Sequence, residues 1–274
     1  MIDPRESRAL LAVAVVVTLA CACGPRAASD LGAPGHEPSS SASTPAPTPA
    51  DALARRIFRA AGGESLGQVA ELRFRFVVLD HGQQRMAAFH RWDLRGNRDH
   101  VTWTDKVGRQ LDAVVDLRSR EATGLVDAVP ASGESLHGLA TDAYARWVND
   151  SYWLMVPLKV LDAGVERELE PDRPCGAATC QVLRLRFDHV GLTPGDTYWL
   201  IVDPRSDRIV RWEMILETQK PPPHGFDWSD YRTLGPIALA HRHVSDDGGL
   251  EIDFTETLAL AALDDHDFQI ADVR

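Results

Sequence analysis

Two histidines, His241 and His243, stand two residues apart in a segment that has the alternating pattern of a β-strand. On a strand this spacing directs both imidazoles to one face, which suits metal ligation. A neighbouring strand would have to supply a third ligand, such as His90, His100 or Asp253. The acidic, solvated setting explains both histidines without a metal. We therefore predict no metal site and keep a metal-dependent hydrolase as a distant alternative.

A second arrangement that could do chemistry is His90 with Asp93, which lie near serine and threonine residues and have the residue types of a hydrolase triad. We expect no nucleophile elbow to expose a serine, so convergence alone would have to supply the geometry. The glycine pairs at 62–63 and 248–249 lack a phosphate-binding frame and indicate a helix end and a turn. We therefore predict no catalytic residues and no cofactor.

Cys175 and Cys180 are the cysteines outside the N-terminal region, and four residues separate them. In an oxidising compartment this spacing predicts a disulfide that closes a hairpin loop. A metal pair and a redox pair are the alternatives. A zinc site normally needs four ligands, and the neighbouring sequence offers no cysteine or histidine at a matching spacing.

The N-terminus has the pattern of an export signal. Arg5 and Arg8 precede an apolar run over residues 9–20, which stops at Cys21 and Cys23. This run is shorter than the roughly 20 residues that cross a bilayer. It resembles a bacterial lipoprotein signal, in which the first cysteine of the mature chain receives acyl chains. The resemblance implies a protein held to a membrane by lipid, because two or more acyl chains anchor stably.

Either thiol, Cys21 or Cys23, has a small residue just before it. We favour Cys21, since Leu19 supplies the apolar residue that is usual upstream of the cut. An ordinary secreted protein cleaved nearby is the alternative. No aspartate follows either cysteine, so lipoprotein sorting predicts an outer-membrane anchor facing the periplasm, with the leaflet left open.

Composition divides the rest of the chain into a tether and one domain. Residues 21–50 are rich in proline, serine, threonine and alanine and have too little apolar surface to fold. Residues 51–274 are long enough for a single domain with a substantial core. The formal net charge of −11 argues against a nucleic-acid partner. The basic patch of Arg55, Arg56 and Arg59 is predicted to be the solvated face of a helix.

Hydrophobic periodicity predicts the elements of this domain. A hydroxyl cap, a proline and a carboxylate over residues 48–51 begin a helix that the glycines at 62–63 end. Alternating patterns then predict about ten half-buried strands joined by short turns. A second helix covers about 139–150 and runs into the apolar segment 151–157. The fold class is therefore mainly β: a large curved antiparallel sheet with helices packed on one face.

Four segments of this domain resemble uncharacterised bacterial lipoproteins of the LolA/LppX type. They are Val148–Lys159, Gly195–Pro204, Val210–Glu213 and His90–Asp93. The resemblance implies an unclosed half-barrel whose concave face, covered by helices, houses acyl chains. It implies no catalytic residues. A lipid-anchored relative could be a receptor, a lipid shuttle or a scaffold that has lost its cargo.

Large aromatic residues on the predicted strands and helix are the candidates for lining such a cavity. They are Phe74, Phe76, Trp92, Trp103, Trp153, Trp199 and Trp212, and each would equally serve an ordinary core. Trp153 and Trp199 are the favoured lining residues, because Trp199 alternates onto the face opposite Tyr198. We predict a protein that binds or transfers a lipid or acyl chain. The alternative is a structural or interaction lipoprotein of the envelope that binds no ligand.

Overall fold

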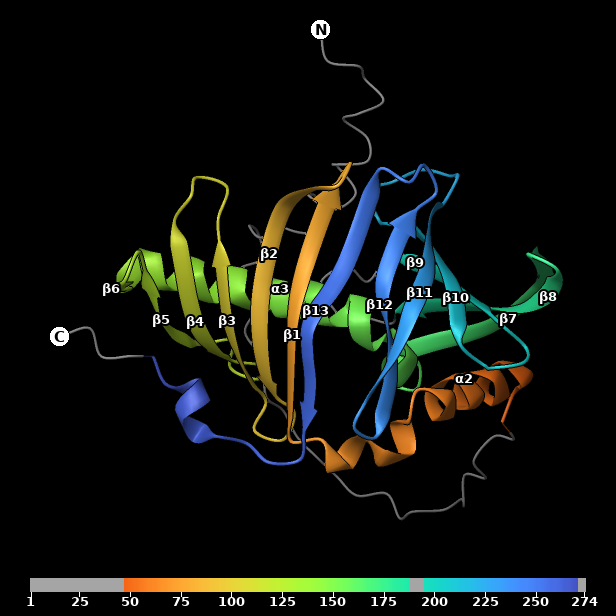
Figure 1. The fold of residues 1–274 in the computed structure, drawn as a ribbon, viewed down its shortest axis with the longest axis horizontal. Coiled ribbons are helices and arrows are strands. Elements are labelled where there is room, and N and C mark those ends of the chain that lie inside the picture. Colours follow the sequence, from red (N-terminus) through yellow and green to blue (C-terminus); the bar gives the residue numbers. More distant parts are fainter. Residues whose placement is uncertain (1–46, 188–194, 271–274) are drawn as a thin grey trace, which may run out of the picture.

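The structure is a computed structural model that describes residues 47–187 and 195–270. Thirteen antiparallel strands form one sheet, and the helices α2 (Pro49–Ala60) and α3 (Gly133–Lys159) pack against it (Figure 1). The strands are β1 (Glu71–Asp80), β2 (Gln83–Asp93), β3 (Arg98–Thr104), β4 (Gln110–Asp116), β5 (Ala122–Val126), β6 (Val129–Pro130), β7 (Val165–Cys175), β8 (Ala178–Phe187), β9 (Thr197–Val202), β10 (Ile209–Ile215), β11 (His224–Leu234), β12 (Ile237–Ser245) and β13 (Leu250–Leu260).

The strand order explains why the sheet is open. From edge to edge it runs β6-β5-β4-β3-β2-β1-β13-β12-β11-β10-β9-β8-β7, so β1 and β13 meet at the centre. The edge strands β6 and β7 are consecutive in the chain, and α3 connects them across the sheet (Figure 1). A helix of 27 residues extends about 40 Å, which is enough to make this crossing. The predicted unclosed antiparallel sheet is confirmed.

The sheet has more strands than the sequence predicted, because some strands are too short to display a period. β6 has two residues and β5 has five. An alternating pattern is recognisable only over longer runs. The long strands follow the prediction: on β1, Leu72, Phe74 and Phe76 are buried on the side of the helices, and Arg73 and Arg75 lie on the other side. We call the helix side the concave face and the opposite side the convex face.

Helix α2 begins and ends as predicted. Thr48 is its N-cap, and the Thr48 hydroxyl and the Asp51 carboxylate form a capping box. The chain then leaves the helix through Gly62, whose φ of 81° favours glycine. The basic patch differs from the prediction in one residue. Arg56 does not lie free in solvent but pairs with Asp207 at 3.0 Å.

Helix α3 is longer than predicted, because it continues through the segment 151–157 to Lys159. Pro157 lies in its last turn, where a missing N–H removes only one helical hydrogen bond. Residues 153–158 are all buried, against the sheet on one side and α2 on the other. This burial on every side hides the helical period, since no polar face interrupts the apolar run.

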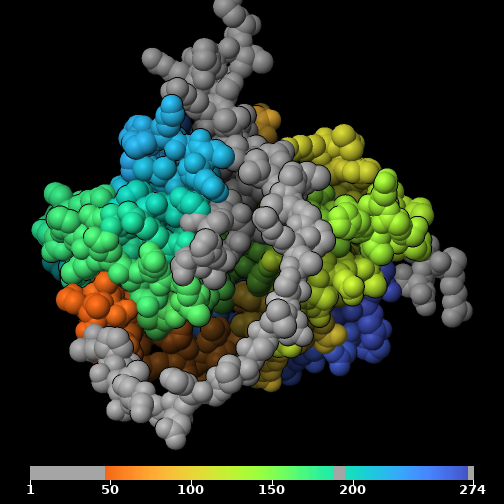
Figure 2. All heavy atoms as spheres, turned by 180° about the vertical axis from the view of Figure 1, so that it is seen from behind, coloured from red at the N-terminus to blue at the C-terminus, as the bar shows by residue number. Residues whose placement is uncertain are grey.

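The core divides into unequal parts. The main cluster lies between the concave face, the second half of α3 and α2. A smaller cluster lies under the first half of α3 and contains Trp103, Leu111 and Ala113 of the sheet with Leu139 and Ala143 of the helix. Viewed from the helix side, β3–β6 and β7–β10 stand on either side of the face that α3 crosses (Figure 2). Within the described ranges no helix is long and apolar enough to cross a membrane.

The convex face carries ionic contacts instead. The C-terminal turn η3 (Asp265–Phe268) packs there, where Asp267 accepts from Arg73 at 2.6 Å and lies 3.5 Å from Arg91. The guanidinium of Arg98 covers the ring of Phe268. The two faces of the sheet therefore differ in chemistry: the concave side holds the main apolar and aromatic core, and the convex side carries partly exposed ion pairs and one small apolar cluster around Cys180 and Ile201.

Candidate functional site

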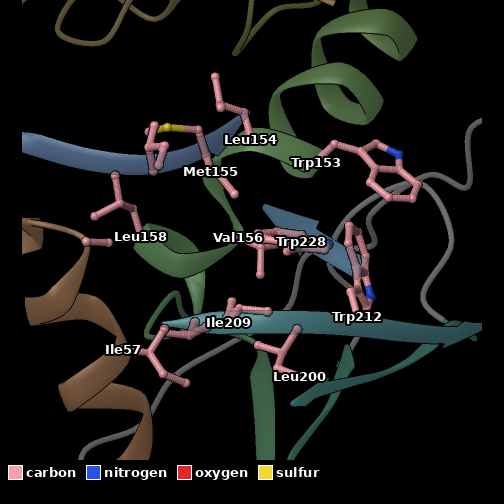
Figure 3. Close-up of a cluster of buried hydrophobic side chains, with 14 of the residues drawn as sticks. Ile57, Trp153, Leu154, Met155, Val156, Leu158, Leu200, Ile209, Trp212 and Trp228 are labelled. Carbon is pink, nitrogen blue, oxygen red and sulfur yellow. The ribbon is translucent and has the colours of Figure 1, made fainter. Parts of the chain in front are cut away.

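An aromatic cluster occupies the concave face where the second half of α3 meets β10–β12. The ring of Trp153, on α3, lies 4.5 Å from that of Trp212 and 4.9 Å from that of Phe226. Trp228 contacts Trp212 at 5.7 Å and His243 at 4.3 Å. Figure 3 shows Trp212 and Trp228 side by side, with Trp153 approaching from the helix. Register places these residues together, because Trp212 pairs with Phe226 and Trp228 with His243 across the strands.

The ring contacts continue outward to partly exposed residues. Tyr152 is the next residue along α3, and its ring lies about 6 Å from those of Phe187, Tyr198 and Trp212. Phe187 and Tyr198 are themselves 5.2 Å apart. Tyr152, Phe187 and Tyr198 are each half-buried, whereas Trp212 is 2% exposed. A connected aromatic surface thus runs from the interior to the solvent.

Three buried side chains in this cluster carry polar atoms without a hydrogen bond. They are the Nε1 atoms of Trp212 and Trp228 and both ring nitrogens of His243, none of which has a partner in the described structure. We call these residues the aromatic trio. Burial, with His241 nearby, lowers the pKa of His243 to about 3, so its imidazole is neutral at physiological pH. A neutral imidazole offers one donor and one acceptor.

A second buried polar group lies at the middle of α3 and pairs a histidine with two carboxylates, and Asp99 Oδ1 is its one atom without a partner in the described structure. His90 of β2 donates from Nδ1 to Asp99 of β3 at 2.7 Å and from Nε2 to Asp150 of α3 at 3.2 Å. The imidazole stacks on Phe74, and Arg146 lies 4.0 Å from Asp150. We call His90, Asp99 and Asp150 the ionic cluster. Burial alone would lower the pKa of His90, but the two carboxylates outweigh it and raise that pKa to about 9.

The ionic cluster fastens the helix to the sheet, and it was not predicted from the sequence. One signal was present: the strand alternation places His90 between Ala88 and Trp92 on an apolar face, where a histidine needs partners. Its partners could not be read off, because Asp150 is 60 residues away along the chain. Asp93, the partner considered in sequence, instead braces the β2–β3 turn and accepts from Arg98 at 2.9 Å.

The predicted lining residues fall into three groups. Phe74, Phe76, Trp153 and Trp212 belong to the main cluster, and Trp92 packs against it, edge-on to Trp147. Trp103 belongs to the smaller cluster under the first half of α3.

Trp199 does not join the other predicted lining residues. Because β9 alternates, Leu200 faces the main cluster and Trp199 packs on the convex face with Cys180, Val182 and Ile201. The alternation of Trp199 away from Tyr198 was predicted, and Tyr198 is the residue of this strand that reaches the aromatic surface. Contact of any of these residues with a ligand stays a prediction.

The two histidines of the metal hypothesis have separate environments. His241 is hydrogen-bonded through Nδ1 to the Leu239 carbonyl and through Nε2 to the Thr257 hydroxyl, both at 2.9 Å. His243 packs among aromatic rings as one of the trio. Among residues 47–187 and 195–270, no group of three or more His, Cys, Asp or Glu side chains could hold a metal ion.

A Gly-x-Ser-x-Gly pattern is present over residues 63–67, which the sequence reasoning overlooked. It forms η2 (Gly63–Gln68), a 3₁₀ turn between α2 and β1. A nucleophile elbow instead lies between a strand and the helix that follows it. The order of elements here is the reverse, so this segment does not present Ser65 as a nucleophile at the top of a sheet.

The predicted disulfide between Cys175 and Cys180 is confirmed and closes the β7–β8 hairpin. Beside it on the convex face is a groove of about 450 Å³, lined by the disulfide, Ile201, Val210 and charged side chains. Its charges neutralise one another: Arg211, for example, lies 3.0 Å from both Glu213 and Asp227. The predicted lipidation residues Cys21 and Cys23, and the signal and tether they belong to, lie outside the described residues.

Neither a protein-family model nor a curated protein matches this chain in sequence. Solved structures are similar to it in fold. A DUF1329 family protein from Desulfovibrio piger has 10% identity and a TM-score of 0.47, over 81% of this chain and 97% of that one. A LolA superfamily protein from Nitrosomonas europaea has 12% identity and a TM-score of 0.49, over 79% and 97%.

The lipoprotein LppX from Mycobacterium tuberculosis has 9% identity and a TM-score of 0.32, over 78% of this chain and 98% of that one.

Proposed function

We propose that this chain is a lipid-anchored protein of the cell envelope that binds or transfers an apolar ligand, a lipid or an acyl chain, on its concave face. The observation that carries the proposal is the connected aromatic surface from Trp212 in the interior to Tyr152, Phe187 and Tyr198 at the solvent. Apolar side chains that are continuous from core to solvent give an acyl chain a route into the fold.

The physical chemistry of binding requires no charged pocket. Each methylene of an acyl chain that leaves water contributes about 0.8 kcal/mol, so a few methylenes against aromatic rings supply useful affinity. Aromatic rings suit this role because they offer large, stiff contact areas at little cost in rotamer entropy. The function is therefore binding, and the proposal assigns no catalytic step to the chain.

A structural or interaction module of the envelope is the second candidate. The observation that favours it is the ionic cluster, which fastens α3 to β2 and β3 and so resists separation of the helix from the sheet. On this view the aromatic surface is a filled core, and the chain holds no cargo.

Native mass spectrometry of the full chain purified from membranes separates the two candidates. A binding protein retains one lipid-sized adduct, or takes up a fluorescent fatty acid after delipidation, whereas a module without cargo shows a bare mass and no uptake. Neighbouring residues of β9 supply a matched pair of variants. Tyr198→Glu places a charge on the aromatic surface and should abolish the adduct, and Trp199→Glu places it on the convex face and should preserve the adduct. Equal retention by both variants would contradict the proposal.

The lipid anchor is tested separately. Radiolabelled palmitate should label the wild-type chain, and Cys21→Ser should abolish the label. Labelling that survives Cys21→Ser but not Cys23→Ser moves the anchor to the second cysteine. Labelling that survives both single variants contradicts a unique lipidated thiol.

A further inference from the structure

The aromatic trio is an unusual feature of a folded core. Trp212 and Trp228 are 2% and 4% exposed, and His243 is fully buried. Together they place four nitrogen atoms without partners among rings that touch one another in the described chain. More than nine in ten buried polar groups have a hydrogen-bond partner, and each one that lacks it weakens the fold. Such groups gathered at one point indicate that a partner arrives from outside the chain.

The charge of the surroundings decides the chemistry of that partner. Across the described ranges, every cation–π contact lies at another aromatic residue, and the trio takes part in no ion pair. Burying a carboxylate or phosphate without a cation costs far more than burying a neutral group. Two indole donors and one neutral imidazole match an uncharged oxygen that accepts hydrogen bonds.

We infer that the aromatic trio is a polar subsite that binds a neutral carbonyl oxygen, such as the ester group of an acyl lipid, while the acyl chain lies along the aromatic surface. The inference rests on the proposed function and adds the substrate class: neutral acyl esters in preference to free fatty acids or hydrocarbons. The indoles of Trp212 and Trp228 donate to the ester oxygen, and His243 supplies the third polar contact.

A small pocket lies beside this region, at the β12–β13 turn, and Phe226 joins the two. It has a volume of about 110 Å³ and is lined by Phe226 and Leu250 of the main cluster together with polar residues of the β12–β13 turn. Phe226 contacts Trp153, which in turn contacts Trp212 and His243. The rings of Phe226 and Trp153 therefore separate the pocket from the trio, and both must move before a ligand reaches it.

Two photoreactive probes test the inference on the full chain purified in detergent. One is methyl palmitate with a diazirine on its acyl chain, and the other is hexadecane with the same diazirine. The quantity measured is the probe concentration that gives half-maximal cross-linking. Partition of a probe into micelles is the same for every variant, so ratios between variants report binding alone.

Phenylalanine substitutions remove the donors and keep an aromatic ring, which is smaller than the indole. Trp212→Phe and Trp228→Phe should each raise the half-maximal concentration of the ester probe about fivefold, the loss of one neutral hydrogen bond. The hydrocarbon probe should change by less than about twofold, because no polar contact is lost. Trp153→Phe is the matched control: it is in the same cluster, its nitrogen is not among the unpartnered buried atoms, and it should leave the preference for the ester unchanged.

Thermal unfolding without ligand is the companion measurement. Each donor substitution leaves a cavity at a buried site, as Trp153→Phe does, but it also removes a polar atom without a partner, so its Tm should fall no further than that of Trp153→Phe. If one variant fails to fold, the other tests the same donor pair.

If the donor substitutions shift the half-maximal concentrations of both probes equally, or leave that of the ester probe unchanged, the subsite is overturned. The proposed binding of lipid is not affected by that result. Wild-type chain that cross-links to neither probe overturns the proposed function, and the subsite with it. An ester preference lost only in the donor variants supports both.

Discussion

Two buried histidines on the concave face have opposite environments. His90 is held between the carboxylates of Asp99 and Asp150, and its pKa is raised to about 9. His243 lies among aromatic rings without a hydrogen bond in the part of the chain that the structure describes, and its pKa is lowered to about 3. The first is charged and the second neutral at physiological pH. The burial of a histidine therefore does not reveal its role. The partners that the fold supplies decide that role.

The comparison distinguishes a structural group from one available to a ligand. Each nitrogen of His90 is satisfied by the protein itself, and its bonds join α3 to two strands. The nitrogens of His243 have no hydrogen-bond partner in the described structure, so a ligand could bind them. If this interpretation is right, changes at His90 should affect stability, and changes at the aromatic trio should affect binding.

The largest expected effect is on stability at the ionic cluster. His90→Leu leaves two buried carboxylates without the imidazolium between them, and only Arg146, 4.0 Å from Asp150, remains near, so we expect a loss of about 3–5 kcal/mol in the free energy of unfolding. Urea unfolding at neutral pH measures it. The matched control is His137→Leu, at an exposed histidine of α3, where the change should stay within about 0.5 kcal/mol. Similar losses at the two positions would show that the ionic cluster does not fasten the helix.

Stability should fall as the pH becomes alkaline, and we call this part of the stability curve the alkaline limb. It should come from His90. Its folded pKa is raised above the unfolded value of 6.5, so its contribution is fully present below pH 6.5 and is lost as pH rises through about 9. The shift corresponds to a loss of about 3 kcal/mol over this window. Urea unfolding as a function of pH checks it. Asp99→Asn should flatten this limb, and an unaltered limb in that variant would mean that another group titrates.

Stability should also fall as the pH becomes acid, and we call this part of the curve the acid limb. It should come from His243, whose pKa shift has the opposite sign. Its folded pKa lies below the unfolded value, so the unfolded chain binds the extra proton and stability falls as pH drops below 6.5. Between pH 6.5 and about pH 5 this amounts to about 2 kcal/mol. His243→Phe should reduce the acid limb to the part that His241 contributes, since burial lowers the pKa of His241 as well, and should preserve the alkaline limb. Loss of both limbs together would break the distinction between the two histidines.

The smallest effect concerns an element that touches neither histidine. Thr48→Ala removes the hydroxyl half of the α2 capping box and should cost about 1 kcal/mol. Both pH limbs should persist with their slopes unchanged, since α2 contributes to neither buried imidazole. The stability curves of this variant therefore serve as a baseline. A changed slope of either pH limb would indicate that unfolding of α2 contributes to the pH dependence.

Local sequence was enough for the elements that depend on neighbouring residues. The capping box at Thr48 and Asp51, the alternation of Leu72, Phe74 and Phe76, and the Cys175–Cys180 bridge all involve residues at most five positions apart. The prediction of α3 failed in its second half, because a helix that is buried on every side shows no alternation of apolar and polar residues. The second half of α3 reads as a continuous apolar run because residues 153–158 are enclosed on every side.

The candidate site was predictable only in part, because the sequence does not show strand order or register. Trp153 and Trp212 were predicted as lining residues, and they do contact each other. Trp228 and Phe226 were missed, although β11 alternates in the same way as its neighbours, and His243 was considered only as a metal ligand. Which aromatic residues share a surface depends on strand order and register, and the β10–β11–β12 pairing that joins them is a property of the assembled sheet.

The amino-acid sequence by itself predicted an export signal and a tether, and it determined an acidic charge, a β-rich domain and a hairpin disulfide, because composition, periodicity and short-range spacing fix these features. The tertiary structure alone decided that α3 would cross from one edge of the sheet to the other and bring Asp150 to His90 and Trp153 to Trp212. The physical reason is that a buried polar group takes its charge state from whatever packs against it. For His90 and His243 those neighbours come from distant parts of the chain.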